Sequence, residues 1–145
     1  TAANSSSISD GAAALVLGTR ADGAIARIMS HASHAQAPSD FPTAPVPAAE
    51  KLLARIGWTR DDVDLWEVNE AFAVVPMAFM ARMGVSHDRV NVNGGACALG
   101  HPIGASGARI IVTLIHALQA RGLKRGVAAI CIGGGEGTAL AVELV

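Results

Sequence analysis

Two side chains with chemically useful groups stand beside glycine-rich stretches of the sequence, His101 in LGHPIG and Cys131 in CIGGGEG. His101 comes immediately before an apolar segment that is expected to be a helix. The dipole at a helix N-terminus disfavours a protonated imidazole, so His101 should be neutral and able to accept a proton or donate one hydrogen bond. A histidine satisfied by backbone groups is the alternative that the sequence leaves open.

Cys131 ends an apolar run, two residues before the glycines of GGGEG. A thiol at the C-terminal edge of a strand suits acid–base or nucleophilic chemistry, and the N–H groups of Gly133 and Gly134 could bind an oxyanion. Packing of the thiol in the core is the competing interpretation. The second cysteine, Cys97 in GGACALG, is expected to fill space among small residues.

The motif WEVNEAF places Asn69 and Glu70 at an expected junction between a strand and a helix. Asparagine is a good N-cap and glutamate suits a first helical turn. The functional alternative is an amide that points into a site at the end of a strand, where α/β folds commonly bind ligands.

Nucleotide and metal sites are not indicated. The glycine runs contain no GxxxxGK[ST], and no GxGxxG opens a helix after the first expected strand. The remaining histidines lack metal-ligand spacing and are assigned to the surface or to packing: His31, His34, His87 and His116.

Strands and helices that alternate along the chain should position these groups, which indicates an α/β fold with a buried sheet. The expected strands are residues 12–17, 24–35, 65–68, 126–133 and 138–145, the last two as an antiparallel hairpin. Helices are expected after Pro47 up to a stop at Gly57, over residues 70–84, and over residues 103–120.

The composition bounds the class of protein. The chain has 145 residues, enough for one domain with a core, and a net charge of −1 that suggests no nucleic-acid or anionic-membrane partner. It is 51% hydrophobic and 16% charged, so part of its surface should be covered by another domain or subunit. Residues 103–120 are apolar almost all round and should lie between layers. The cysteines fit free thiols in a reducing compartment. We expect no signal peptide and no membrane span.

Five motifs in a fixed order carry a resemblance to a known family: NSSSISDGAA, APVPA, WEVNEAFA, NVNGGACALGHPIGASGAR and CIGGGEG. Together they resemble the C-terminal half of a thiolase of the acetyl-CoA acetyltransferase family, acetoacetyl-CoA type, over residues 1–145. The resemblance implies one half of an αβαβα layered sandwich, with a mixed five-stranded sheet and helices on both faces. It also implies a homodimer or homotetramer and an N-terminal domain, absent from this chain, that carries the nucleophilic cysteine.

The activity that the resemblance implies is Claisen condensation of two acetyl-CoA, or the reverse CoA-dependent thiolysis of acetoacetyl-CoA or another 3-ketoacyl-CoA. The substrates are then coenzyme A thioesters, with no covalently bound cofactor and no metal. The chain alone should be inactive. The expected location is the cytoplasm of a bacterium, or the mitochondrion in a eukaryote. The alternative is a non-catalytic module that binds acyl-CoA or lipid.

The resemblance also implies a role for each matched residue. Asn69 holds a water in a first oxyanion hole, and His101 contributes to that hole and helps to activate the nucleophilic thiol. Cys131 is the acid/base that exchanges a proton with the acetyl methyl group, and the N–H of Gly133 belongs to a second oxyanion hole. The other matched positions line the substrate: Ser6 beside the pantetheine, and Phe41 and Phe72 around the acyl group.

Two features depart from the family pattern. Only GTRADGA joins the first two expected strands, where the family has a short helix, and a parallel crossover needs a dozen or more residues. Either these strands pair differently, or residues of the crossover are missing from this sequence. Glu136 replaces a residue that is usually uncharged, and nothing in the sequence explains it.

Overall fold

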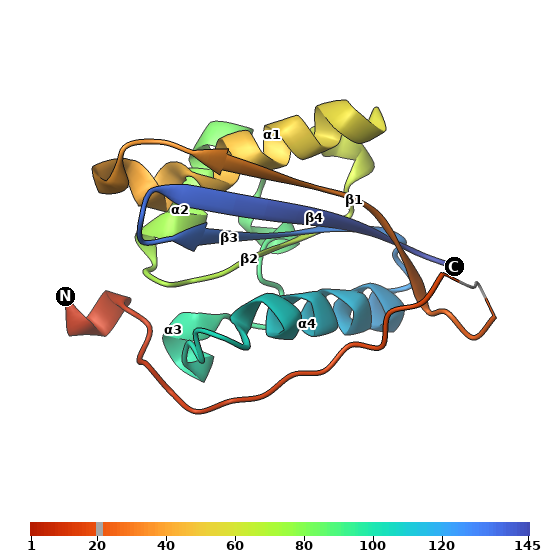
Figure 1. Ribbon diagram of the computed structural model, residues 1–145, viewed down its shortest axis with the longest axis horizontal. Coiled ribbons are helices and arrows are strands. Elements are labelled where there is room, and N and C mark those ends of the chain that lie inside the picture. The colour runs from red at the N-terminus through yellow and green to blue at the C-terminus, as the bar shows by residue number, and fades with distance from the viewer. Residues whose placement is uncertain (20–21) are drawn as a thin grey trace.

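A four-stranded mixed sheet forms the centre of the computed structural model, which describes residues 1–19 and 22–145 (Figure 1). The strand order is β1-β4-β3-β2. β2 and β3 are parallel, and the other neighbours are antiparallel. The strands are β1 (Ala26–Ala35), β2 (Leu65–Val68), β3 (Arg125–Ile132) and β4 (Glu136–Leu144).

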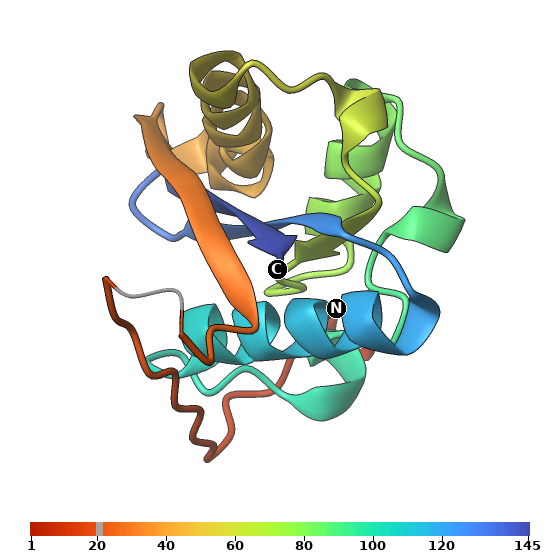
Figure 2. The ribbon, with the colours of Figure 1, turned by 90° about the vertical axis from the view of Figure 1, so that its right-hand side faces the viewer.

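Helices cover both faces of this sheet (Figure 2). α1 (Pro45–Ile56) and α2 (Val74–Met83) lie on one face, and α4 (Ser106–Arg121) lies on the other, with the single-turn α3 (Ala96–Leu99) near its start. The expected α/β class with helices on both faces is therefore confirmed. Short 3-10 turns complete the chain: Ala2–Asn4, Pro38–Thr43, Arg60–Asp62 and His87–Arg89.

Alternation along β2 divides the core in two, because successive side chains of a strand point to opposite faces. Trp66 packs against Phe79 of α2, with 5.3 Å between ring centroids, and Leu65 joins the cluster that includes Leu114 of α4. The same alternation sends Glu67, and Asn69 two residues further on, toward α4. Both are buried, at 2% and 0% exposure.

Glycines in the left-handed region end the long helices, as the sequence predicted for two of them. Gly57 (φ 69°) follows α1 and Gly84 (φ 64°) follows α2. The expected helix over residues 70–84 is wrong at its start, since α2 begins only at Val74 with Ala73 as its N-cap. Residues 71–73 instead make backbone hydrogen bonds to the N-terminal segment, Ser6 N to Ala71 O among them.

α4 also starts later than predicted, at Ser106 instead of Ile103. Residues 103–105 form a turn, in which the N–H groups of Ala105 and Ser106 both donate to the carbonyl of Pro102. The helix is buried along its sheet-facing side only, and Ile111 at the margin of that side is only partly buried. Burial all round is therefore not reached within this chain.

The predicted strand over residues 12–17 is wrong, which reduces the sheet from the expected five strands to four. The segment runs beside α4 outside the sheet (Figure 1), and Leu17 is 72% exposed. β1 already pairs with β4 along its length and forms the edge of the sheet. With no strand at 12–17, the short connection over residues 18–24 needs no parallel crossover. Arg20 and Ala21 of that connection lie outside the described residues.

No helix among the described residues is long and apolar enough to cross a membrane.

Candidate active site

Three segments that are distant in the sequence meet beyond the C-terminal end of β2. They are residues 69–73, the loop 100–106, and the N-terminal segment. Ser6 N donates to Ala71 O at 3.1 Å, and His101 N donates to Ser7 O at 2.8 Å. The N-terminal segment thus ties the two other loops together.

A clamp on β2 fixes the position of Asn69. On one side, Asn69 N donates to Ala129 O of β3 at 2.9 Å. On the other side β2 is the edge of the sheet, and the side chain of Asn91 pairs with its backbone as a neighbouring strand would. Asn91 Oδ1 accepts from Val68 N at 2.7 Å, and Asn91 Nδ2 donates to Val68 O at 2.8 Å. Asn91 has φ 50°, a left-handed conformation that asparagine tolerates.

Asn69 and His101 are brought into direct contact. Asn69 Nδ2 lies 3.3 Å from His101 Nε2, and His101 Nδ1 lies 2.5 Å from the hydroxyl of Ser106, which in turn donates to Pro102 O at 3.2 Å. Burial first, and the charge of Arg109 second, lower the pKa of His101. The expectation of a neutral imidazole agrees with this direction.

A buried ion pair lies directly behind Asn69. Arg109 Nη1 of α4 donates to Glu67 Oε1 at 3.1 Å, with side-chain exposures of 18% and 2%. Arg109 Nη2 also reaches Asn69 Oδ1 at 3.5 Å. Burial raises the pKa of Glu67 to about 7, an effect that Arg109 partly offsets and the charge of Glu70 reinforces.

We predict that Glu67 makes folding pH-dependent. Its pKa is raised from 4.5 to about 7, so between these values the folded state binds more protons than the unfolded one, and stability falls as pH rises. The expected loss of unfolding free energy from pH 4.5 to 7.5 is about 3 kcal/mol. Urea unfolding of the wild type and of Glu67→Gln across this range measures it.

His101 and the other titrating groups are common to both proteins, so the difference between the two pH profiles isolates Glu67. The Glu67→Gln profile should lack the decline. Parallel profiles would show that Glu67 is ionised throughout.

The side chain of Cys131 belongs to the core cluster of α1 and α2, whereas His101 contacts Asn69 and Ser106. The Cys131 side chain is buried, and no contact with Asn69 or His101 occurs in the described part of the chain. Burial raises the pKa of the thiol, and a backbone hydrogen bond opposes this only in part. The thiol is therefore protonated at neutral pH in this chain.

The turn between β3 and β4 is hydrogen-bonded to the chain at Gly135 and exposed at Gly133. Gly135 (φ 103°) accepts a hydrogen bond at its carbonyl from Gln36 N at 3.0 Å. Gly133 is exposed, and a Cβ there would meet no atom within 4 Å. Glu136 is exposed at the start of β4, and nothing in the structure explains its charge.

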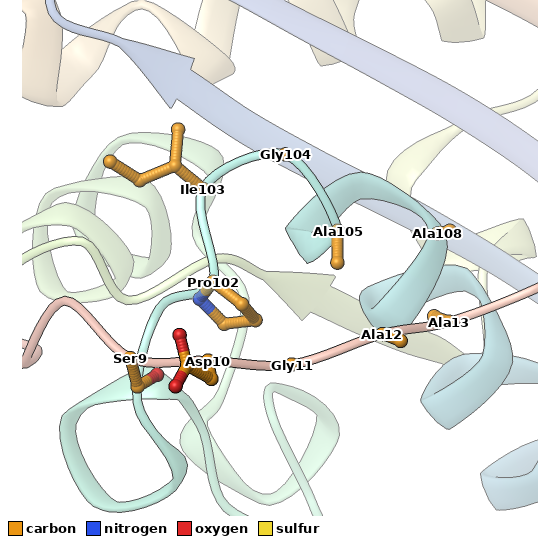
Figure 3. A pocket seen from close by; sticks show the side chains of 10 residues that line it. All are labelled: Ser9, Asp10, Gly11, Ala12, Ala13, Pro102, Ile103, Gly104, Ala105 and Ala108. Carbon is orange, nitrogen blue, oxygen red and sulfur yellow. The ribbon is translucent and has the colours of Figure 1, made fainter.

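The predicted lining residues lie near the same end of the sheet. Ser6 donates its hydroxyl to Ala71 O at 2.8 Å. Phe41 and Phe72 make an edge-to-face contact with 5.9 Å between centroids, and Phe72 is 41% exposed. A cleft of about 500 Å³ opens beside the His101 loop, between residues 9–13 and residues 102–108 (Figure 3).

Glu70 has a different role from the predicted one. It does not enter α2; its carboxylate accepts from the N–H of Cys97 at 3.1 Å and from Asn91 Nδ2 at 3.1 Å, at the start of α3. Gly95 makes this approach possible, since a Cβ there would stand 2.2 Å from the Glu70 carboxyl carbon. Cys97 is exposed, so its assignment as a space filler is wrong.

Sequence reasoning missed the residues that hold Asn69 and His101. Glu67 and Arg109 carried a signal, because each is a charged residue within a largely apolar stretch. Ser106 and Asn91 carried none. Among the described residues, no group of side chains could hold a metal ion. The remaining histidines are exposed or half-buried, as expected: His31, His34, His87 and His116.

Comparison with known proteins identifies the class to which this fold and these loops belong. Residues 23–144 match the family described as thiolase, C-terminal domain, and the chain belongs to that family. The unpaired segment 12–17 lies outside the matched region. A curated relative from Mus musculus, named acetyl-CoA acetyltransferase, cytosolic, is 48% identical over 149 residues that cover 99% of this chain and 38% of the relative.

Two solved structures share the fold. The acetyl-CoA acetyltransferase of Bacillus anthracis superposes with a TM-score of 0.82 and 44% identity, over 83% of this chain and 31% of that one. The Acat5 thiolase of Ascaris suum in complex with coenzyme A gives a TM-score of 0.79 and 48% identity with the same coverage. This chain therefore spans between 31% and 38% of the length of these relatives.

Proposed function

We propose that this chain forms the C-terminal part of an acetyl-CoA acetyltransferase, which condenses two acetyl-CoA to acetoacetyl-CoA and CoA or catalyses the reverse cleavage. The observation that carries the proposal is the contact of Asn69 with a neutral His101, at 3.3 Å, in a member of the thiolase family. A buried amide and a neutral imidazole are fixed groups that can stabilise an enolate oxygen and accept a proton.

In condensation, the nucleophilic thiol of another domain has already taken the first acetyl group and released CoA. The thiolate of Cys131 removes a proton from the methyl carbon of the second acetyl-CoA. Asn69, through a water, and His101, which holds on Nε2 the proton that it took from the nucleophilic thiol, stabilise the enolate oxygen. The methyl carbon attacks the acetyl-enzyme carbonyl. The N–H of Gly133 stabilises the resulting oxyanion, which collapses and expels the thiolate of the other domain.

Cleavage runs these steps backwards and begins with Cys131 as a thiol. The raised pKa of Cys131 in this chain fits that protonated form, which delivers its proton to the departing acetyl-CoA carbanion. Condensation needs the thiolate, so it needs a group from the completed site that lowers this pKa. Ser6, Phe41 and Phe72 then line the pantetheine and the acyl group.

The partners in this proposal are acyl-CoA and the domain that carries the nucleophile, within a homodimer or homotetramer in the cytoplasm. Exposed apolar side chains offer surfaces for that domain and for further subunits. They include Ile8, Val16, Leu17, Met77 and Ile103.

CoA-dependent cleavage of acetoacetyl-CoA tests the proposal. We expect no activity from this chain alone, and activity when it is joined to the N-terminal part of a relative such as the mouse acetyltransferase. Activity of the chain alone would mean that Cys97 or Cys131 is itself the nucleophile. A folded but inactive joined protein would contradict the proposal and favour a non-catalytic acyl-CoA-binding module.

A further inference from the structure

The hydrogen bonds around His101 form a chain that runs from Arg109 to the carbonyl of Pro102, and its direction is set at the Arg109 end. At one end stands Arg109, and a guanidinium can only donate. Its contact with Asn69 Oδ1, at 3.5 Å, therefore turns the amide so that Nδ2 faces His101 Nε2, 3.3 Å away. Because the amide nitrogen donates, Nε2 must be the unprotonated ring nitrogen.

The other end of the chain accommodates the same tautomer, but the rotatable hydroxyl of Ser106 does not by itself select it. The carbonyl of Pro102 can only accept, so the hydroxyl of Ser106 donates to it at 3.2 Å. The oxygen of Ser106 then accepts from His101 Nδ1, 2.5 Å away, which carries the ring proton in this arrangement. In water the Nε2–H form of histidine is the more populated one, so the surroundings hold His101 in the less favoured tautomer.

We propose that Arg109 is a positioning residue that, acting through Asn69, fixes the proton of His101 on Nδ1 and leaves the lone pair of Nε2 as a proton acceptor. The use of that lone pair, to receive the proton of a nucleophilic thiol, rests on the proposed function; the tautomer does not. The contact of Asn69 with Nε2 is long at 3.3 Å, so an incoming donor can replace it.

Glu67 has a supporting part in this arrangement. It is 2% exposed and accepts from one branch of the guanidinium fork at 3.1 Å, which leaves the other branch directed at Asn69. Lysine would compensate the charge of Glu67 equally, but its single ammonium lacks the planar fork that reaches both acceptors. The site thus needs arginine for its geometry as well as for its charge.

Long-range 1H–15N spectra of the histidine rings at pH 7.5 test the tautomer directly, with His101 assigned by comparison with His101→Gln. The wild type should show the Nδ1–H form. Glu67→Gln is the matched control, because its amide oxygen still accepts from Arg109, and it should keep that form. Glu67→Gln/Arg109→Met removes both charges together with the donor to Asn69, and should shift His101 toward Nε2–H.

A double variant that keeps the Nδ1–H form would overturn the proposal and leave Arg109 a purely structural role. If the double variant does not fold, Arg109→Lys replaces it: a mixture of tautomers supports the proposal and a wild-type spectrum refutes it. In the completed enzyme, the double variant should acylate on the order of tenfold to a hundredfold more slowly than Glu67→Gln. A tautomer shift in a protein that shows no thiolase activity would leave this inference standing while the proposed function fails.

Discussion

Replacing Cys131 by serine in the completed enzyme is expected to lower both condensation and cleavage by roughly a thousandfold, within the range that general acid–base catalysis contributes. A serine hydroxyl neither gives up nor returns a proton at neutral pH, so the methyl carbon loses its acid/base. The fold should survive, because the substitution exchanges sulfur for oxygen at a single buried position. Steady-state rates in both directions, with circular dichroism as a check of folding, measure the effect.

Cys97→Ser is the matched control, since Cys97 is the exposed thiol of the same chain. Among the described residues, its side chain makes only a long contact, 3.8 Å, with the backbone carbonyl of Glu70, and the hydrogen bond from its N–H to the Glu70 carboxylate does not depend on the side chain. This variant should keep wild-type rates. Near-normal turnover of the Cys131 variant would remove Cys131 from the acid/base role, whereas a loss confined to the Cys97 variant would move that role to the other thiol.

The sequence predicted the parts of the fold that local patterns determine. The apolar runs of β2, β3 and β4 were found, and the glycines that end α1 and α2 were identified from their positions alone. Asn69 and His101 were chosen separately, as groups beside strand and helix ends. Their contact could not be derived from the residues, because 32 positions separate them along the chain and the N-terminal segment has to bridge their loops.

The strand expected at residues 12–17 shows where local patterns fail. AAALVL has the composition of a buried strand, but a strand exists only where a neighbour offers backbone groups to pair with. In this chain the segment runs beside α4 (Figure 1) and does not pair with the free side of β1, the edge strand, so the apolar run is left exposed. The six residues would have the same sequence whether their pairing partner were a strand within residues 23–144, the region that matches the family, or a strand outside that region.

The ion pair behind Asn69 was missed for a different reason. Glu67 and Arg109 lie 42 residues apart. Each alone interrupts an apolar pattern. The pair is recognised only when the alternation of side chains along β2, which directs Glu67 toward α4, is compared with the position of Arg109 on α4. A charge within a buried element needs a partner. Two such charges of opposite sign in neighbouring elements are therefore a signal that a search for pairs would find.

Replacing His101 by alanine should slow two steps, because the imidazole is proposed to take the proton of the nucleophilic thiol and to stabilise the enolate oxygen. Loss of one oxyanion-hole donor costs about a hundredfold to a thousandfold, and loss of the proton acceptor adds to the cost of acylation. We expect acyl-enzyme formation from acetyl-CoA and carbon–carbon bond formation each to fall by at least about a hundredfold. Burst kinetics separates the two rates.

His116→Ala tests whether any histidine of this region would give the same result. His116 is exposed on α4, away from the loop that carries His101, so its removal should change neither rate. Unchanged acylation in His101→Ala would exclude the imidazole as the acceptor for the thiol, even if bond formation fell. The same outcome would separate the two proposed uses of His101, because the enolate is stabilised by hydrogen-bond donation whereas the thiol is activated only by a free lone pair on Nε2.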